Sequence, residues 1–164
     1  MQGRAQHSCT VAFNLYWLTP VLTLPVYGTE ADFESDLRSM INNSLPDKVE
    51  CRQQFTIGRQ FPYDILLYER VDKTLNLIAG NNAKKLVIIE LKHVRMGWVN
   101  KKDSNSYKLG PSMIYKTFEQ HMADADLPAR VAAAKVTFPE AKCHAIFIMA
   151  VHGGRYRVGR YSPS

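Results

Sequence analysis

The sequence predicts a mixed α/β or α+β domain, and three observations support this. Apolar residues recur at helical spacing early in the chain, continuous apolar runs cover residues 86–89 and 143–151, and turn-forming residues separate these segments. With 164 residues, 46% of them hydrophobic and 22% charged, the chain has the size and composition of one globular domain. We therefore expect residues 29–164 to form a single domain, with residues 1–28 as an extension packed on it.

The first expected element is a helix that begins after Thr29, whose hydroxyl can accept a hydrogen bond from an unpaired backbone N–H of the first turn. Acidic residues follow directly, where the helix dipole favours negative charge. Phe33, Leu37 and Ile41 supply the apolar face. Residues 42–46, which include two asparagines and a proline, end the helix.

Strands and two further helical segments are expected in the rest of the chain. We expect strands at residues 50–57, 63–71, 86–89 and 143–151, a short strand or hairpin arm at 75–79, and a turn at 153–154 followed by a strand at 156–161. One helix is expected from about Pro111 and another from Pro128 to Phe138, after a lysine-rich stretch at 97–110 that we expect to be a mobile loop. The resulting order is a helix, three or four strands, helix and further strands.

The apolar stretch Val11–Tyr27 lacks the pattern of a membrane-spanning helix. Asn14, Pro20 and Pro25 interrupt it, and it falls short of the ~20 apolar residues that a spanning helix needs. Its end also fits a signal-peptide cleavage site poorly. Three cysteines without a CxxC pair indicate neither a disulfide framework nor a zinc site. We therefore expect an intracellular protein, in the cytoplasm or nucleus, that binds no membrane; a secreted effector is the alternative.

The net charge of +6 is distributed unevenly along the chain. Residues 1–50 carry three basic and six acidic side chains, whereas residues 51–164 carry eighteen basic and nine acidic ones. Such a basic field attracts polyanions such as nucleic acid, although many basic proteins bind none. Trp98 lies in the lysine-rich stretch, where its ring could stack on a base or pack against the domain.

Glu90 and Lys92 interrupt the most apolar strand of the chain. Side chains two positions apart on a strand share a face, so both point the same way while Leu91 points into the core. Burying charges without partners is costly, so these two groups need compensation. A salt bridge, or a strand end that reaches solvent, is the simplest explanation.

Asp64 is a second acid at the margin of an apolar strand, and it permits another explanation. If the strands that begin near Tyr63 and Leu86 are neighbours, the carboxylates of Asp64 and Glu90 can approach one another. Two carboxylates repel unless a cation lies between them, and oxygen ligands, to which the Leu91 carbonyl could add a third, suit Mg²⁺ or Mn²⁺. Lys92 would then lie beside the metal, able to orient water or to stabilise charge on a phosphate.

Asp64, followed by Glu90-x-Lys92 on an apolar strand with a helix before and a helix after, resembles the PD-(D/E)XK nuclease superfamily. This superfamily includes restriction endonucleases and Holliday-junction resolvases. The resemblance covers about residues 29–151. It implies a restriction-endonuclease-like core of order αβββαβ, in which helices flank a central mixed β-sheet. It also implies that Asp64 and Glu90 bind the metal and that Lys92 is the catalytic lysine.

The resemblance extends to two further candidates and includes one departure. Many members place a glutamate on the first helix, for which Glu30 is the candidate and Glu34 the alternate. A glutamine on the helix after Glu-x-Lys is also common, and Gln120 fits it; for Glu30 and Gln120 a solvated helix residue is the other interpretation. The Pro-Asp pair of the family is split in this sequence, since one residue separates Pro62 from Asp64.

The leading hypothesis is therefore a metal-dependent nuclease that hydrolyses phosphodiester bonds of DNA, or of RNA. Its cofactor would be Mg²⁺ or Mn²⁺. The catalytic candidates are Asp64, Glu90, Lys92, Gln120 and Glu30. The first alternative is a catalytically inactive module of the same fold, effector-like, that binds nucleic acid or a protein partner. The second is a structural α/β domain whose Glu-x-Lys forms only a salt bridge. A homodimer is compatible with each hypothesis.

Overall fold

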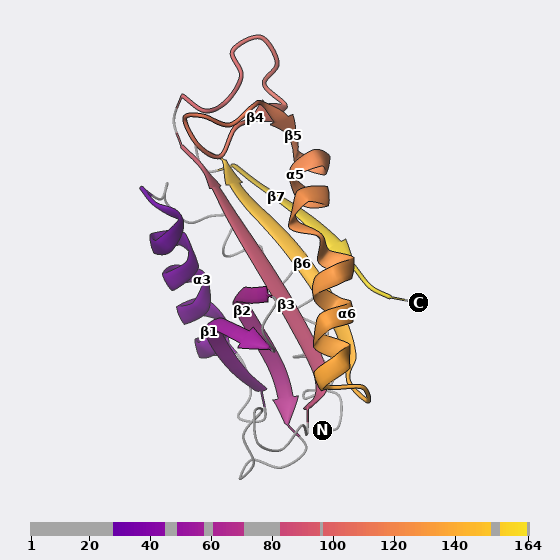
Figure 1. The fold of residues 1–164 in the computed structure, drawn as a ribbon. Helices are drawn as coiled ribbons and strands as arrows, with labels where there is room; N and C mark the ends of the chain where they lie inside the picture. The colour runs from indigo at the N-terminus through magenta and orange to yellow at the C-terminus, as the bar shows by residue number, and fades with distance from the viewer. Residues whose placement is uncertain are drawn as a thin grey trace.

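A five-stranded mixed sheet forms the centre of the molecule (Figure 1). The computed structural model describes residues 28–44, 49–57, 61–70, 83–95, 97–151 and 155–163. The strands are β1 (Val49–Ile57), β2 (Phe61–Arg70), β3 (Ala83–Val94), β6 (Lys142–Val151) and β7 (Arg155–Tyr161), in the spatial order β1-β2-β3-β6-β7. β3 and β6 are parallel, and the other neighbours are antiparallel. The expected mixed α/β class is therefore confirmed.

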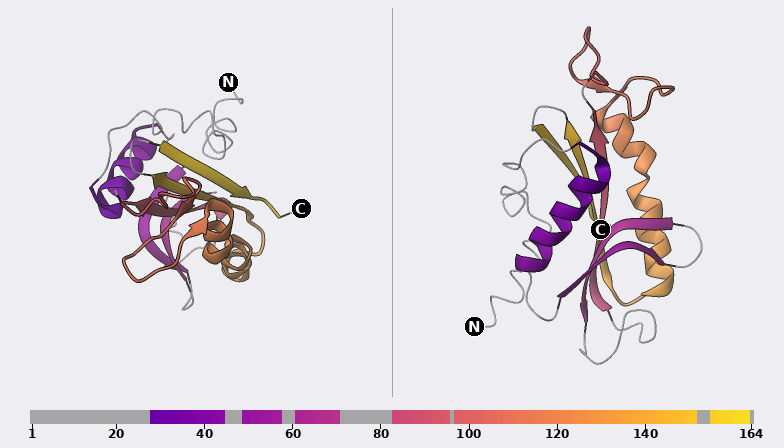
Figure 2. Two further views of the ribbon diagram at one scale, coloured as in Figure 1. Left: turned by 90° about the horizontal axis from the view of Figure 1, so that it is seen from above. Right: turned by 90° about the vertical axis from the view of Figure 1, so that its left-hand side faces the viewer.

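Helices cover both faces of this sheet (Figure 2). Helix α3 (Glu30–Ser44) packs on one face through the fully buried side chains of Phe33, Leu37 and Ile41, as its sequence pattern predicts. Helices α5 (Phe118–Ala125) and α6 (Leu127–Thr137) lie on the opposite face. None of the helices in the described ranges is long and apolar enough to cross a bilayer.

β3 is buried on both of its faces, which explains its continuous apolar sequence. Leu86 and Ile88 pack in the cluster on the α6 side, whereas Val87, Ile89 and Leu91 pack in the cluster under α3. Parallel pairing requires a crossover connection between the two strands. The chain passes from β3 to its parallel partner β6 through a crossover that contains α5 and α6. The strand expected at 86–89 is thus longer than its apolar run indicates, because polar residues continue it at both ends.

The hairpin of β1 and β2 leaves the sheet at one end. β2 pairs with β1 along its length, but its pairing with β3 begins only at Ile65, opposite Ile89. The part of β2 before this point curls towards α6, where the Tyr63 hydroxyl donates a 2.9 Å hydrogen bond to the carbonyl of Arg130. The edge of β3 beyond Ile89 is therefore not paired by β2.

One expected helix boundary is wrong, and several expectations fall outside the described residues. No helix begins at Pro111: residues 111–115 form turns and loop, and α5 begins at Phe118 after the short strand β5 (Lys116–Thr117). Thr117 caps α5 in a box with Gln120, which explains the true start. The lysine-rich stretch contains β4 (Ser106–Tyr107), paired with β5. The expected extension at residues 1–27, the strand or hairpin arm at 75–79 and the turn at 153–154 lie outside the described part of the chain.

Candidate active site

Asp64 and Glu90 lie beside one another where β2 separates from β3. The backbone N–H of Asp64 donates to Glu90 Oε1 at 3.3 Å, and the backbone N–H of Leu91 donates to Asp64 Oδ2 at 2.8 Å. The antiparallel pairing of β2 and β3 brings together these residues, which are 26 positions apart in the sequence. The approach expected from neighbouring strands is therefore present.

Two carboxylates take the place of the missing strand along this edge of β3. The N–H groups of Leu91 and His93 point to the side that β2 has left, since alternate residues of a strand form hydrogen bonds to the same neighbour. Asp64 Oδ2 accepts from Leu91, and Glu30 Oε2 accepts from His93 at 3.2 Å. Acids from β2 and α3 thus satisfy backbone donors that would otherwise lie unpaired inside the protein.

Glu90 is the most perturbed carboxyl group of this cluster. It is only 4% exposed, on the side of the sheet covered by α6. Burial raises the pKa of Glu90 to about 8, and the neighbouring Asp64 carboxylate adds to the increase. Arg130 opposes this shift: its Nη1 lies 3.3 Å from Glu90 Oε1. Because burial is the largest cause, the shift reflects the removal of Glu90 from water more than the charge of its neighbours.

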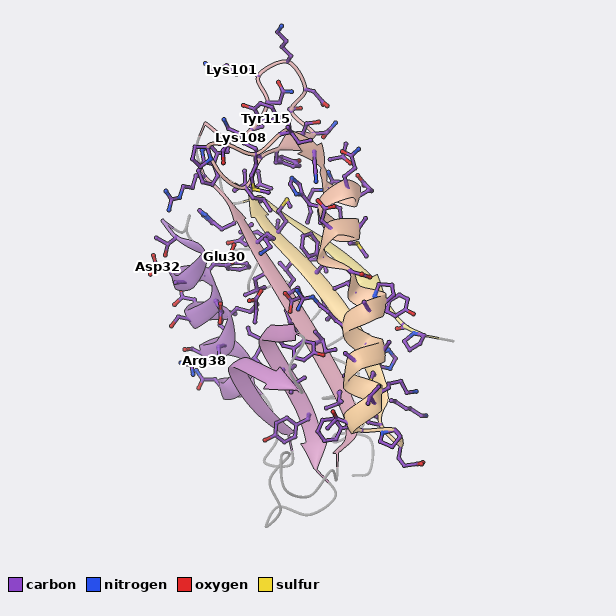
Figure 3. All side chains as sticks on the ribbon, in the orientation of Figure 1. Glu30, Asp32, Arg38, Lys101, Lys108 and Tyr115 are labelled. Carbon is purple, nitrogen blue, oxygen red and sulfur yellow. The ribbon has the colours of Figure 1, made fainter. Side chains whose placement is uncertain are left out.

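Lys92 and Glu30 complete the cluster at its more exposed end. Lys92 Nζ lies 4.0 Å from Glu30 Oε1, and the two side chains are 37% and 41% exposed. Figure 3 shows Glu30 at the end of α3 that approaches the sheet. Burial raises the pKa of Glu30, and the carboxylates of Asp64 and Glu34 add to the increase while Lys92 lowers it. We call Glu30, Asp64 and Glu90 the acidic corner.

Arg130 is the member of the site that sequence reasoning missed. Its Nε donates a 2.9 Å hydrogen bond to the carbonyl of Ala125, which holds the guanidinium towards Glu90. A local signal for it exists in the sequence. Arg130 follows Leu127 by three positions and precedes Ala134 by four, and both of these residues are buried. An arginine on the buried stripe of an otherwise apolar helix predicts a buried acidic partner.

Gln120 lies in a different environment from the acidic corner. Its side chain is exposed, and its Oε1 accepts a 2.9 Å hydrogen bond from the backbone N–H of Thr117 at the start of α5. Its own backbone N–H donates to the Thr117 hydroxyl, so the side chain completes a capping box. The alternate candidate Glu34 is 5% exposed on the inner face of α3.

The lysine-rich stretch is a folded element at the far end of the sheet, where Figure 3 labels Lys101, Lys108 and Tyr115. Trp98 packs partly buried against the core, with the Arg95 guanidinium 5.2 Å from its ring. Lys108 lies 5.4 Å from the ring of Tyr115, which is 41% exposed. The ring packed against the domain is therefore Trp98, and the exposed aromatic ring is Tyr115.

A metal would find a small set of ligands at the acidic corner. Among the described residues, no three histidine, cysteine, aspartate or glutamate side chains form a group that could hold a metal ion. Asp64 and Glu90 therefore form a pair that Glu30 does not extend to three. The Leu91 carbonyl belongs to the same edge of β3 as its N–H, which Asp64 accepts.

Comparisons with known proteins return no match for this chain, whether against family models, curated proteins or solved structures. The functional interpretation therefore depends on the geometry of the chain itself.

Proposed function

We propose that the protein is a divalent-metal-dependent nuclease that hydrolyses phosphodiester bonds of DNA, with RNA as the alternative substrate. The observation that carries this proposal is the meeting of Asp64 and Glu90 at the point where β2 leaves β3. Lys92 follows Glu90 by two positions and lies at the more exposed end of the cluster. Two acids and a lysine in this arrangement suit phosphodiester hydrolysis.

The topology supports the resemblance to the PD-(D/E)XK superfamily. A helix, three antiparallel strands, a helical crossover and a parallel strand follow one another as α3, β1, β2, β3, α5 with α6, and β6. This succession supports the proposal of a restriction-endonuclease-like core of order αβββαβ, with the short strands β4 and β5 between β3 and α5. The proposed ligands also come from the two strands, β2 and β3, to which the resemblance assigns them.

The donor set fits a hard divalent cation. The cluster offers two carboxylates and a strand carbonyl, all oxygen ligands of the kind that Mg²⁺ and Mn²⁺ prefer. Burial, and after it the Asp64 carboxylate, raises the pKa of Glu90 to about 8, and a bound cation would favour the ionised form. Asp64, Glu90 and the Leu91 carbonyl would hold the ion, and water would supply its remaining ligands.

Residues around the proposed metal site would each have a separate role in phosphodiester hydrolysis. The bound ion supplies positive charge to the phosphate and makes a water molecule more acidic. Lys92 carries an ammonium on a flexible side chain and can donate hydrogen bonds to a phosphate oxygen on which negative charge develops. Glu30 lies 4.0 Å from that ammonium and would position it. The Leu91 N–H holds Asp64 Oδ2 in place, which fixes the orientation of the carboxylate.

The test is Mg²⁺-dependent cleavage of a supercoiled plasmid and of single-stranded DNA and RNA by the wild type and four variants. Glu90→Gln and Lys92→Ala should each reduce cleavage about 100-fold or more. The matched controls Glu119→Gln and Lys101→Ala remove the same groups from exposed positions and should cleave normally. Undiminished cleavage by both Glu90→Gln and Lys92→Ala, with folding verified by circular dichroism, would contradict the proposed nuclease function.

One observation favours the alternative of an inactive module with the same fold. Arg130 already places a positive charge 3.3 Å from Glu90, where it partly offsets the negative charge without a metal. Isothermal titration with Mg²⁺ and Mn²⁺ separates the two functions. A nuclease binds the ion and loses that binding in Glu90→Gln, whereas a module stabilised by Arg130 alone shows no saturable binding.

A further inference from the structure

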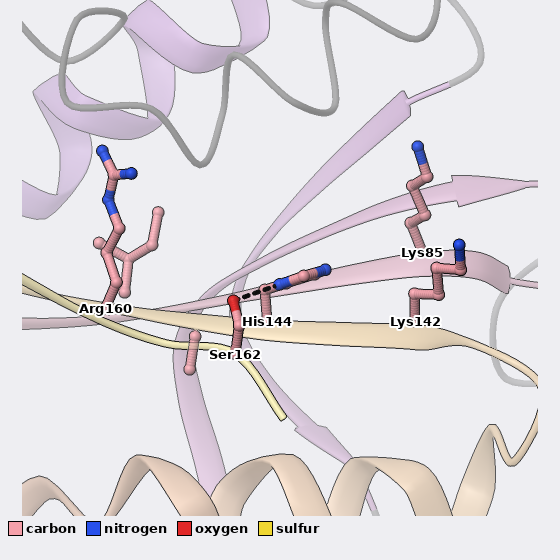
Figure 4. Close-up of a pocket in the computed structure, with 7 residues that line it drawn as sticks. Lys85, Lys142, His144, Arg160 and Ser162 are labelled. Atoms are coloured by element: carbon pink, nitrogen blue, oxygen red, sulfur yellow. Dashed lines mark hydrogen bonds between the residues drawn. The ribbon is translucent and has the colours of Figure 1, made fainter. Parts of the chain in front are cut away.

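A pocket of about 420 Å³ lies over β3, β6 and β7, and basic side chains line it. Lys85, Lys142 and Arg160 each contribute a cation from a different strand, and His144 contributes an imidazole. Figure 4 shows the three cationic side chains extending to the side of the sheet that faces α3. No carboxylate belongs to the part of the lining that the structure describes. We call these four residues the basic pocket.

The position of its two lysines makes the basic pocket unusual. Lys85 and Lys142 are direct partners in the parallel pairing of β3 and β6. Like charges that face one another across strands are destabilising. Glu69 on β2 is the partner of Lys85 on its other side, so one acid belongs to the same row of paired residues as the two lysines. The three cations of the lining thus outnumber the one acid of this row.

His144 is held between these cations and the C-terminal segment. Its Nδ1 lies 2.6 Å from the Ser162 hydroxyl, which fixes the orientation of the ring (Figure 4). Burial lowers the pKa of His144, and the charges of Lys85 and Lys142 lower it further. The ring thus reports the electrostatic potential of the pocket, and an anion bound beside it would reverse the effect of the two lysines.

We propose that the basic pocket binds a phosphate monoester dianion, carried by a small molecule or by the end of a nucleic-acid strand. Three cations from three strands converge on a space whose volume is typical of small-molecule sites. Ammonium and guanidinium groups form strong charge-assisted hydrogen bonds to phosphate oxygens. A monoester presents two negative charges where a backbone phosphodiester presents one, so the pocket selects terminal over internal phosphates.

This binding site is distinct from the proposed nuclease centre. Glu90 lies on the α6 side of the sheet, whereas the pocket residues Lys85, His144 and Arg160 lie on the α3 side. Alternation along the strands accounts for the difference, since Lys85 and Glu90 on β3 have opposite parity. The inference goes beyond the proposed function and does not depend on it.

The primary test is isothermal titration of the full chain, without divalent cations and at constant ionic strength, with inorganic phosphate and with a nucleoside 5′-monophosphate. The double variant Lys85→Gln/Lys142→Gln should weaken binding of both ligands about tenfold or more, since each lysine contributes a charge-assisted hydrogen bond. The control Lys101→Gln/Lys102→Gln removes the same charge from the exposed loop and should change the dissociation constant less than twofold.

Thermal unfolding provides a second measurement that separates binding from folding. Without ligand, the double pocket variant should be about as stable as the wild type, because the loss of the Lys85–Lys142 repulsion offsets the loss of the attraction between Lys85 and Glu69. Added phosphate should raise the melting temperature of the wild type and of the loop control but not that of the pocket variant. Absence of saturable phosphate binding by the wild type, or equal weakening by the two double variants, overturns the proposal.

The source of the phosphate follows from a competition experiment. A 5′-phosphorylated oligonucleotide that displaces the monophosphate, while its 5′-hydroxyl counterpart does not, identifies a strand end as the ligand. Displacement by neither oligonucleotide identifies a free small molecule. Both results support a monoester site, whereas equal displacement by the two oligonucleotides contradicts it, because the pocket would then bind internal phosphates.

Discussion

The acidic corner and the basic pocket are two charged sites that include residues of the same strand, β3. They differ in sign and in how far their charged side chains are paired. At the acidic corner, every carboxylate has a described partner: Asp64 and Glu30 accept hydrogen bonds from backbone N–H groups in place of a strand, and Arg130 pairs with Glu90. In the basic pocket, Lys85 and Lys142 face one another without a carboxylate in the described lining.

This difference separates a cluster of like charges that has a role in the fold, the acidic corner, from one that indicates a ligand, the basic pocket. The carboxylates have a role in the fold, because they satisfy donors along the edge that β2 leaves, and their remaining negative charge is a consequence of that role. The lysines near the start of β3 and β6 face one another across the strands, and one acid, Glu69 on β2, is the strand partner of Lys85.

The largest expected effect separates the functions of the two sites. Asp64→Asn should reduce Mg²⁺-dependent cleavage about 100-fold or more while phosphate binding in the basic pocket stays unchanged. Lys85→Gln/Lys142→Gln should weaken phosphate binding and leave Mg²⁺-dependent cleavage unchanged. Cleavage rates and phosphate titrations on both variants test this expectation. A variant that loses both activities, while its circular dichroism is that of the wild type, would show that the two sites act as one.

The next largest effect concerns the ion pair of Arg130 with Glu90. Arg130→Ala leaves a buried carboxylate without its cation and should lower the free energy of unfolding by about 2–4 kcal/mol at pH 9. At pH 6 the loss should be smaller, because Glu90, whose pKa burial raises to about 8, is then mostly protonated. Urea unfolding at the two pH values measures the difference.

Lys116→Ala is the matched control for that experiment. Lys116 Nζ lies 2.6 Å from Asp124 Oδ2, but the Asp124 side chain is 55% exposed. Exposed ion pairs contribute about 0–1 kcal/mol, so this variant should be close to the wild type at both pH values. A loss from Arg130→Ala that does not exceed that of Lys116→Ala would show that Glu90 needs no cation.

A smaller effect of opposite sign is expected for Glu90→Gln. The pKa of Glu90 is raised in the folded protein relative to the unfolded chain, so the wild type loses stability as the pH rises from about 4.5 to about 8. The amide carries no charge and retains an oxygen that can accept from the Asp64 N–H. Without metal, the variant should therefore gain about 1–3 kcal/mol relative to the wild type between pH 6 and pH 9. A pH-independent difference would contradict the shift.

The parts of the fold with dense local signals could be predicted from the sequence. The cap at Thr29 and the spacing of Phe33, Leu37 and Ile41 locate α3, and the Thr29 hydroxyl does accept from the Asp32 N–H at 3.1 Å. The apolar run at 86–89 locates the central strand. Pro111 was a misleading start signal for the next helix, whereas the capping box of Thr117 and Gln120 was the correct one.

The sites required information that local patterns do not contain. The approach of Asp64 to Glu90 follows from the pairing of two consecutive strands, which a meander allows one to expect. The pair of Lys85 with Lys142 depends on the register of a parallel crossover, where a slip of one residue would turn one lysine to the other face. Arg130 reaches Glu90 only because α6 lies on that face of the sheet.

The smallest expected effect is the change in the pKa of His144 when a pocket lysine is removed. The folded pKa is lowered relative to the unfolded chain, so the protein loses stability as the pH falls below about 6.5. Lys142→Gln removes one of the two repelling charges and should move the His144 pKa back towards its ordinary value, as should saturating sulfate, which remains a dianion throughout. Lys102→Gln removes a charge outside the pocket and should leave the pKa of His144 unchanged. Proton NMR titration of the imidazole measures all three, and a pKa insensitive to both Lys142 and sulfate would mean that burial alone sets it and that no anion occupies the space beside the ring.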